Sequence, residues 1–302
     1  MRLKISVWLI VLFLLIQLAQ AQSGKNGLPF LKMDVDARAA ALGGAYTART
    51  TGAAAAYWNP AGLAAAQNLN FLFMHTAWLA DITQDFAAVQ LLHGTHNLAL
   101  SVNVFTVPGV EIRGDKPTDQ PFGKVDAVNF YAAFSYGRAV NEQWSYGFTV
   151  KYLFEKYYLE SAPGWAMDAG VIYRGFLPGA SMAFVLQNLG RMSPLQTERT
   201  PLPLMARYGL NYIVPFQVLQ QNPSVSLDVQ WVRDEAVYLR AGAEAPVTDY
   251  LFLRAGLISG NDQTLLTAGA GVNYKGFHLD YAFVPVQDNL GSGHRLSLGF
   301  IF

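Results

Sequence analysis

The sequence predicts an all-β protein, a 14-stranded antiparallel transmembrane β-barrel with a short helical N-terminal plug. At the end of the chain, four apolar residues alternate with four mostly small or polar ones: Leu296, Leu298, Phe300 and Phe302 against Arg295, Ser297, Gly299 and Ile301. This period of two separates the side chains onto the two faces of a strand. The chain is 52% hydrophobic but only 14% charged, whereas a soluble domain carries about 25% charged residues. Low charge without a long apolar run is typical of alternating strands that face lipid.

Residues 1–21 have the pattern of a secretory signal peptide. Arg2 and Lys4 give a basic start, an apolar run follows to Leu18, and Ala19-Gln20-Ala21 ends on a small-x-small sequence. The apolar run is too short to span a bilayer comfortably, since a spanning helix needs about 20 residues. We therefore expect cleavage after Ala21, and export to the outer membrane of a Gram-negative bacterium. An uncleaved anchor helix is the alternative.

Residues 22–68 do not follow the strand pattern and are predicted to form a plug. The segment is rich in alanine and carries Gly43-Gly44 in its middle, so its backbone can pack closely against neighbours. Asn59 suits a helix cap and Pro60 the first helical position, which predicts a short helix over residues 60–66. An alanine-rich periplasmic linker is the alternative. The candidate plug residues are Arg38, Gly43, Gly44, Trp58, Asn59, Pro60, Ala61 and Gly62.

Residues 69–302 divide into an even number of strands, as expected of a single-chain bacterial barrel. The predicted strands are 69–79, 85–92, 97–107, 125–138, 143–156, 165–174, 179–188, 204–214, 224–232, 236–245, 249–258, 263–274, 276–284 and 293–302. If the first strand runs outward, the longest polar loops, 108–124, 157–164 and 189–203, all lie outside. Most of the other connections are tight turns, except 215–223. Long outer loops with short periplasmic turns are the expected asymmetry.

The two faces of the strands have different compositions. Three strands carry outward apolar rows: Trp144, Tyr146, Phe148, Val150, Tyr152 and Phe154; Val225, Leu227, Val229 and Trp231; Phe277, Leu279, Tyr281 and Phe283. The candidate lumen residues are Lys151, Asp168, Arg207, Asp228, Arg240, Glu244, Arg254, His278 and Asp280. Asp228, Arg240, Glu244 and Arg254 fall on three successive strands, so we expect them to pair across neighbours.

Other residues indicate where the strands cross the membrane boundaries and where the lumen is filled. Six aromatic residues near strand ends fit the interfacial girdles of a barrel: Trp78, Trp144, Trp165, Trp231, Tyr250 and Tyr274. Gly269 and Gly271 on the inward face of one strand indicate curvature or a group packed closely inside.

Catalytic motifs are largely missing from the sequence. The chain has no cysteine, no phosphate-binding glycine loop and no G-x-S-x-G turn. His278 and Asp280 share an inward face. A structural hydrogen-bonded pair is the simpler interpretation, and an acid–base couple the alternative. We therefore expect no enzyme activity, no cofactor and no metal site. The formal net charge is zero, without a basic run, so nucleic acid is not an expected partner.

The N-terminal segment resembles the start of PorV/PorQ-family outer-membrane proteins. The similar residues are Phe30-Leu31-Lys32-Met33, residues 37–46 (ARAAALGGAY) and residues 57–63 (YWNPAGL). That family is related to the FadL-like barrels, so the resemblance implies fourteen strands and an N-terminal hatch. It also implies partners in type IX secretion: the translocon, attachment-complex proteins, and cargo with C-terminal sorting domains. Outer-membrane lipid is the partner implied by the barrel itself.

Two functions follow from these observations. The first is a non-enzymatic shuttle or anchor in type IX secretion and surface attachment, with the outer loops 108–124 and 189–203 as contact sites. The second is transport of hydrophobic small molecules, by analogy with FadL-like barrels, with an apolar pocket near Tyr57 and Trp58. Fold analogy alone supports either function.

Overall fold

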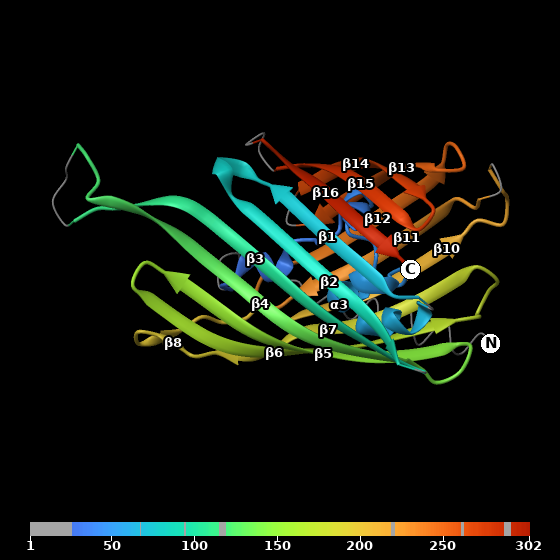
Figure 1. Ribbon diagram of the computed structural model, residues 1–302, viewed down its shortest axis with the longest axis horizontal. Coiled ribbons are helices and arrows are strands. Elements are labelled where there is room, and N and C mark those ends of the chain that lie inside the picture. Colours follow the sequence, from blue (N-terminus) through green and yellow to red (C-terminus); the bar gives the residue numbers. More distant parts are fainter. Residues whose placement is uncertain are drawn as a thin grey trace.

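The computed structural model describes residues 26–66, 68–93, 95–114, 119–218, 221–260, 263–286 and 291–302. The predicted signal peptide lies outside these ranges. Within them, fourteen strands close into an antiparallel barrel, in which the first strand pairs with the last. Figure 1 shows the tilted strands as a single wall around the helical N-terminal segment. The predicted fold class is confirmed.

The barrel strands follow one another in sequence order around the wall, except where β10 pairs with β7. They are β1 Asn70–Ala77, β2 Thr83–His93, β3 His96–Ile112, β4 Gly123–Ala139, β5 Trp144–Tyr157, β6 Glu160–Arg174, β7 Ala180–Met192, β10 Met205–Ile213, β11 Ser224–Val232, β12 Val237–Pro246, β13 Leu251–Gly260, β14 Gln263–Tyr274, β15 Phe277–Pro285 and β16 Ser292–Ile301. Two short strands, β8 (Pro194–Leu195) and β9 (Glu198–Arg199), form a hairpin in the connection from β7 to β10.

The alternation of side chains along each strand produces the two faces that the sequence predicts. On β5, Trp144, Phe148 and Tyr152 are exposed on the outside, while Thr149 and Lys151 between them are buried. The same alternation holds for Leu279 and Asp280 on β15. The strands thus turn apolar rows outward, as a barrel in lipid requires. Their inward side chains are polar, small or, as at Phe86, Phe105 and Tyr131, packed in one cluster with the plug.

The predicted outer loops 108–124 and 157–164 are wrong in extent. β3 continues to Ile112 and β4 begins at Gly123, with a register shift between Val107 and Val110. Pro108 has no N–H for the ladder, and Gly109 adopts a positive φ and donates its own N–H to Asp126. The strand therefore absorbs these two residues as a bulge instead of ending there. Similarly, β6 begins at Glu160 and leaves only a tight turn after β5.

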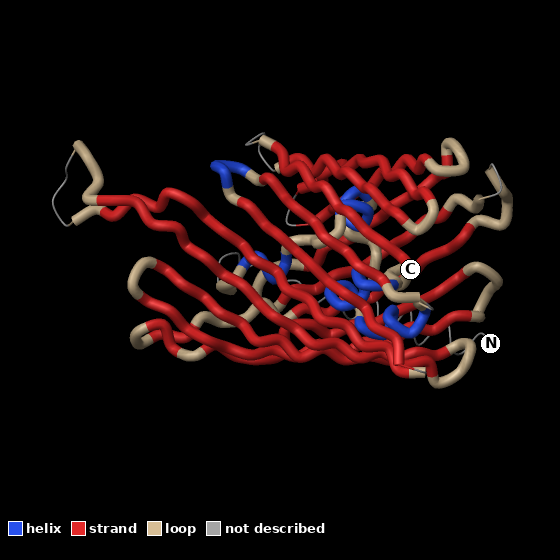
Figure 2. Tube along the Cα trace, in the orientation of Figure 1, coloured by secondary structure: helices blue, strands red, loops and turns tan. Residues whose placement is uncertain are grey.

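The wall is taller on one side than on the other. β3 to β7 contain 13 to 17 residues each, whereas β1 and β12 contain 8 and 10. In Figures 1 and 2 the long strands project beyond the others at the end opposite the label C. That end carries the connection from β3 to β4 and the β8–β9 hairpin. We call it the outer end, because barrels place their longer connections outside.

The N-terminal segment, residues 26–66, lies inside the barrel, and we call it the plug. It contains η1 (Pro29–Lys32), α2 (Ala37–Ala41), η2 (Gly52–Ala54), α3 (Ala55–Trp58) and η3 (Pro60–Ala65). A further short helix, η4 (Leu79–Asp81), follows β1. In the described part of the chain, none of the helices is long and apolar enough to cross a membrane. Figure 2 shows the plug helices within the ring of strands.

The plug runs from the outer end of the lumen to the inner end. At the outer end, Asn26 donates to the carbonyl of Arg233, in the turn between β11 and β12, and Gly27 donates to the carbonyl of Pro201. At the inner end, the Asn70 side chain accepts from the N–H of Ala53, and β1 begins. The chain therefore fills the lumen before it forms the wall.

Candidate functional site

A belt of inward glycines lets the plug backbone approach the wall. At each of them, an added Cβ would lie closer than 3.0 Å to a plug atom. The glycines come from seven strands: Gly137, Gly147, Gly170, Gly209, Gly242, Gly256 and Gly269. Gly269 was predicted to face something packed closely inside, and that group is Ala41 of α2. The second glycine of that strand, Gly271, leaves room for Arg254 and Asp280.

The Asn59-Pro60 motif anchors the C-terminal half of the plug. The side-chain oxygen of Asn59 accepts from the N–H of Ala61, and Pro60 opens η3, as the sequence predicts. The Asn59 amide also donates to the carbonyl of Val171 on β6. Ala61 and Gly62 are buried in the same helix, and Gly62 faces the carbonyl of Thr50. The motif therefore caps a helix and fastens it to the wall.

Tyr57 and Trp58 tie the two halves of the plug together. The Tyr57 hydroxyl donates to the carbonyl of Met33 at 2.7 Å, and Trp58 Nε1 donates to the carbonyl of Val35 at 3.0 Å. Both rings are fully buried. They therefore form the core of the plug, and neither lines the cavities described below; an apolar pocket near them stays a prediction.

Gly43 and Gly44 turn the chain after α2. Both have positive φ, which glycine adopts without the steric cost of a Cβ. The turn brings Gly43 against the backbone of Leu257 on β13, and its carbonyl accepts from Arg240 at 3.0 Å. The conformation that places the plug against β12 and β13 therefore depends on these two residues.

Glu244 on β12 is the main charged anchor of the plug. Its carboxylate accepts two hydrogen bonds from Arg38, at 2.8 and 2.9 Å, and it also pairs with Arg49 of the plug. Arg254 on the neighbouring strand completes the cluster at 2.6 Å and reaches Asp280 on β15 with its other arm. One acidic residue thus binds three arginines, two of which belong to the plug.

The predicted cross-strand pairing is half right. Glu244 and Arg254 are register neighbours and form an ion pair. Asp228 and Arg240 are register neighbours too, but they bind the plug instead. Asp228 accepts from the N–H groups of Tyr46 and Thr47, and Arg240 pairs with Asp34 at 2.8 Å. Since the plug supplies its own donors and a carboxylate, these wall residues have nearer partners there than each other.

The other predicted lumen residues lie in separate environments. Lys151 pairs with Asp168 at 2.7 Å, and both are buried. His278 and Asp280 do not form the predicted pair: His278 shares a hydrogen bond with Asn273 and Asp280 pairs with Arg254. Successive inward residues stand two apart along a strand, so cross-strand partners are closer. Among the described residues, no group of three or more acidic or histidine side chains could hold a metal ion.

Arg207 on β10 is fully buried between wall and plug. Its guanidinium lies over the Trp58 ring, 4.6 Å from the centroid, and its three nitrogens have no hydrogen-bond partner among the described residues. Burial of a charged group without such partners is costly. The cation–π contact with Trp58 offsets part of that cost.

Asp36, the cap of α2, is a titratable group of the plug with an unusual environment. Its side chain accepts from the N–H of Arg38. Burial raises the pKa of Asp36 to about 7, and the nearby carboxylate of Asp280 adds to the rise. A carboxyl whose pKa is raised in the folded chain couples protonation to the docking of the plug.

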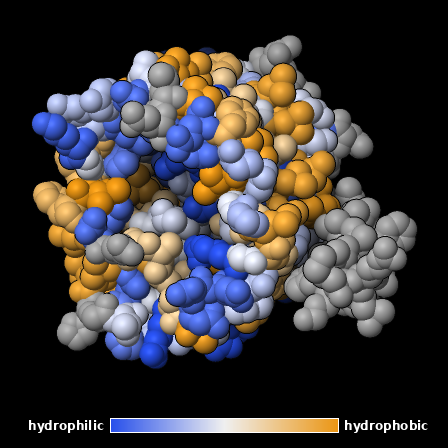
Figure 3. Space-filling view, turned by 90° about the vertical axis from the view of Figure 1, so that its right-hand side faces the viewer, coloured by the Kyte–Doolittle hydropathy of each residue, from blue (hydrophilic) through white to orange (hydrophobic). Residues whose placement is uncertain are grey.

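Two cavities flank the plug inside the barrel. The outer cavity, about 300 Å³, has Lys32, Met33 and Asp34 as its floor and the outer ends of β11 to β16 as its walls. The inner cavity, about 690 Å³, lies between Arg49 and Thr51 of the plug and the turn from β6 to β7. Figure 3 looks onto the inner end, where hydrophilic side chains surround a hollow and hydrophobic ones lie around them. The plug thus separates two partly open chambers.

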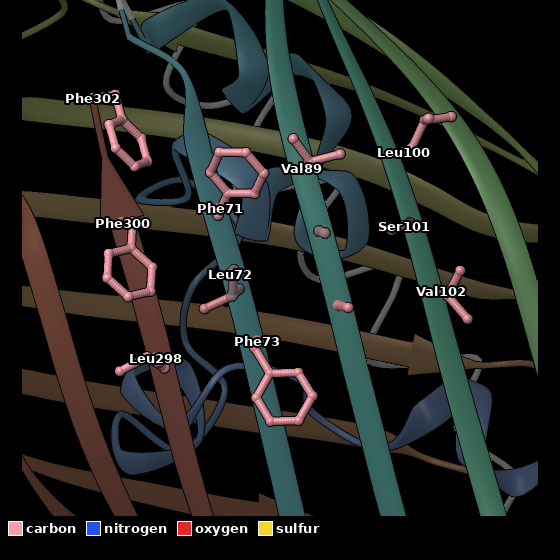
Figure 4. Close-up of a pocket in the computed structure, with 12 residues that line it drawn as sticks. Phe71, Leu72, Phe73, Val89, Leu100, Ser101, Val102, Leu298, Phe300 and Phe302 are labelled. Atoms are coloured by element: carbon pink, nitrogen blue, oxygen red, sulfur yellow. The ribbon is translucent and has the colours of Figure 1, made fainter.

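A third hollow lies on the outside of the wall. Phe71, Phe73 and Phe300 border a groove of about 640 Å³ whose lining is almost wholly apolar. Figure 4 shows their rings on β1 and β16, beside Val89 of β2 and Leu100 and Val102 of β3. The groove belongs to the face that contacts lipid.

Several residues of the lumen were not predicted from the sequence. Asp34 and Arg49 contribute charged contacts to the plug, and Arg295 on β16 lies 5.3 Å from the ring of Trp78. Trp78 was expected in an interfacial aromatic girdle but lines the outer cavity instead. Arg295 stands between the outward residues His294 and Leu296, so strand alternation could have predicted that its side chain points into the lumen. Trp78 follows the end of β1, where strand alternation no longer applies.

Comparisons with known proteins identify the fold but not a family. No protein-family model and no curated protein matches the sequence. Among solved structures, the toluene transporter TodX of Pseudomonas putida matches with a TM-score of 0.63 at 13% identity, over 87% of this chain and 95% of TodX. The monoaromatic hydrocarbon channel CymD matches with a TM-score of 0.60 at 14% identity, over 89% of this chain and 97% of CymD.

The chain has the fold of these channels. At such low identity the likeness shows the fold alone. The expected lack of enzyme activity stays a prediction. A barrel of this kind belongs in an outer membrane, and cleavage after Ala21 stays a prediction. Since no family model matches, the resemblance to PorV/PorQ proteins stays a hypothesis.

Proposed function

We propose that this chain forms an outer-membrane channel that admits hydrophobic small molecules. The observation that carries the proposal is a barrel of the TodX and CymD fold with a plug inserted between an outer and an inner cavity. A solute enters the outer cavity, where Val232, Ile258 and Leu265 offer apolar contacts. Because the plug core is buried, onward passage requires a shift of the plug.

The ion pairs between plug and wall are suited to such a shift. Arg38 and Arg49 both pair with Glu244, and Asp34 pairs with Arg240. Arg49 also donates to the Ser224 hydroxyl on β11. Small side chains of the plug meet wall glycines at seven positions, whereas Phe30 and Tyr57 pack on the rings of Phe86, Phe105 and Tyr131 of the wall. We propose that this arrangement holds the plug closed at rest and lets it yield locally when a solute binds.

Uptake by whole cells tests the proposal. Cells of a host without endogenous hydrocarbon channels are compared with and without expression of this chain, for uptake of labelled toluene at a limiting external concentration. We expect a several-fold higher initial rate with the chain, and an unchanged rate for labelled glucose. Equal toluene rates with and without the chain would overturn the proposal, provided that the folded barrel is present in the outer membrane.

The second candidate, a shuttle or anchor in protein secretion, is favoured by a different observation. At the tall outer end, Phe122 and Leu159 are 71% and 79% exposed, although no lipid is expected to cover that part of the wall. Both side chains are therefore available for contact with another protein. Phe122 lies in the predicted contact segment 108–124, and Leu159 lies at the adjacent tip of β5–β6.

Crosslinking in the native outer membrane tests this second candidate. A photoreactive amino acid at Phe122 should capture a translocon component or a cargo protein with a C-terminal sorting domain. The same amino acid at Lys275, in an inner turn, should not capture them. If neither site captures such a protein, a secretion role for this surface is excluded.

A further inference from the structure

The outer cavity contains a positive charge that the protein does not neutralise. Five charged residues line it, and two pairs of them are matched: Lys32 with Glu235, and Arg240 with Asp34. The fifth is Arg295, which forms no ion pair within the described part of the chain. Its side chain is almost fully buried, at 4% exposure, and Nε and Nη1 have no hydrogen-bond partner there.

A buried guanidinium in this state has unused binding capacity. Buried donors normally have a hydrogen-bond acceptor, and the free-energy cost of leaving a donor without an acceptor is highest when the donor belongs to a charged group. The Trp78 ring lies 5.3 Å from the Arg295 guanidinium and stabilises its charge, but it offers no acceptor for the N–H groups. An anion in the cavity would supply the missing acceptors, and a carboxylate fits the guanidinium geometry best.

The rest of the lining limits the ligand to a small apolar body. Beside the charged groups stand the aromatic rings of Trp78 and Tyr238 and the aliphatic side chains of Val232, Ile258 and Leu265. The volume of about 300 Å³ is at the lower limit of ligand pockets. It has room for a body of roughly one ring.

We propose that the outer cavity is a binding site for a small aromatic monocarboxylate. The Arg295 guanidinium binds the carboxylate of the ligand, and the Trp78 ring packs on the aromatic part of the ligand. The inference rests on the proposed uptake function, because it names a solute class for the first chamber of the channel. Unlike the proposed uptake of hydrophobic molecules, this binding requires that the solute carry a negative charge. The site selects the anion through Arg295, since the other two cations already have partners.

Ligand binding to the purified, folded barrel in detergent tests the inference. Benzoate, its neutral counterpart toluene and the aliphatic anion hexanoate are titrated while Trp fluorescence and heat of binding are recorded. The variants are Arg295→Gln, Arg295→Lys and the control Arg138→Gln, an exposed arginine at the inner end of β4. Retention of the heat-modifiable folded form in gel electrophoresis shows that each variant barrel has formed.

We expect benzoate to bind more tightly than toluene or hexanoate. Arg295→Gln should weaken benzoate binding about ten- to hundredfold, since hydrogen bonds to charged groups contribute about 1.5–3 kcal/mol. The same variant should change toluene binding less than twofold. Arg295→Lys should retain part of the affinity, and Arg138→Gln should retain all of it.

Two results would overturn the inference. One is equal benzoate affinity in Arg295→Gln and the unchanged protein, and the other is toluene binding without benzoate binding. Both leave the proposed uptake function standing, because whole-cell uptake of toluene tests that function separately. Binding of hexanoate as tight as that of benzoate would overturn the aromatic part of the assignment.

Discussion

At the scale of single residues, Glu244 determines how the plug is held. Its carboxylate faces Arg38 and Arg49 of the plug and Arg254 of the wall, in a site largely removed from water. Removing one member of a buried charged cluster leaves the remaining charges uncompensated, which costs about 3–5 kcal/mol. The cluster therefore contributes more to plug docking than any exposed ion pair of the barrel.

The substitution Glu244→Gln should loosen the plug without unfolding the wall. We expect faster hydrogen exchange across residues 36–50, by at least tenfold, while exchange in β4 and β5 stays unchanged. Hydrogen exchange with mass spectrometry measures this directly. The control Glu111→Gln removes an exposed pair with Arg113 and should have little effect. Equal exchange rates in the plug of Glu244→Gln and of the unchanged protein would contradict the anchoring role.

Asp36 should make plug docking dependent on pH. Its pKa in the folded chain is raised to about 7, against an ordinary value of 3.8. At pH values between 3.8 and about 7, the folded state therefore binds the proton more tightly than the unfolded state does. The docked plug loses stability as the pH rises through this range. The change is on the order of 2–4 kcal/mol at most.

The measurement is hydrogen exchange of the plug at pH 5 and pH 8, corrected for the intrinsic exchange rate. We expect greater protection at pH 5. The variant Asp36→Asn should reduce the difference, because its side chain does not titrate. If Asp36→Asn keeps the full pH dependence, another group is responsible.

At the scale of elements, the glycine belt explains how a folded segment fits inside a barrel of fourteen strands. Gly147 on β5 shows the principle, because an added Cβ would lie 2.3 Å from the carbonyl carbon of Pro60. The obstacle there is backbone on both sides, so neither partner can rotate away. Contacts of this kind define the positions at which η3 meets β4, β5 and β6.

The substitution Gly147→Val should displace η3 from the wall. We expect the plug to become cleavable by added protease near Pro60, and the folded barrel to lose about 1–3 kcal/mol of stability from overpacking. Limited proteolysis and urea titration in detergent measure the two effects. The control Gly123→Val, at the start of β4, has only Ile112 within reach, at 3.8 Å. Equal protease resistance of Gly147→Val and Gly123→Val would contradict close docking of η3.

Strand existence was predictable from the sequence, whereas strand length was not. β11 and β14 have the predicted bounds, because alternation and turn residues mark both of their ends. β3 exceeds its prediction by passing through Pro108 and Gly109, which normally mark a turn. The bulge depends on Asp126 of the neighbouring strand, and one strand read alone does not contain that information.

For the candidate lumen residues, the side-chain direction was likewise predictable and the binding partner was not. The inward phase of Arg240 and Asp228 could be read from alternation, but their partners could not. Those partners are Asp34 and the Tyr46 and Thr47 amides, which lie 181 to 206 residues away in the sequence. The belt glycines had a readable signal, since they occupy inward positions on seven strands, and only Gly269 was recognised. Partners that lie far apart in the sequence can be identified only once the fold is known.

At the scale of the whole molecule, the plug starts at the outer end and finishes at the inner end. Asn26 is hydrogen-bonded at the turn from β11 to β12, and Asn70 begins the wall at the opposite end. The lumen is therefore filled by chain that passes through it once. This topology, together with the longer connections, gives the barrel a definite orientation in the membrane.

The orientation predicts which positions can be labelled from outside the cell. The chain has no cysteine, so a single introduced cysteine reports without background. Asn26→Cys should react in intact cells with a maleimide reagent too large to pass through porins. Lys275→Cys, in the turn between β14 and β15, should react only after the outer membrane is opened. The reverse pattern would show that the barrel is inserted the other way.

Transport past the plug is tested most directly by locking the plug to the wall. Thr47 of the plug faces Gly209 on β10, where an added Cβ would lie 2.9 Å from the Thr47 Cβ. Paired cysteines there need a shift of only about 1 Å to reach disulfide geometry. The variant Thr47→Cys/Gly209→Cys is placed in liposomes, and toluene uptake is measured before and after reduction. We expect slow uptake in the oxidised form and faster uptake by the same variant after reduction. Equal rates in the two forms, with the disulfide verified, would show that the solute does not need the plug to move.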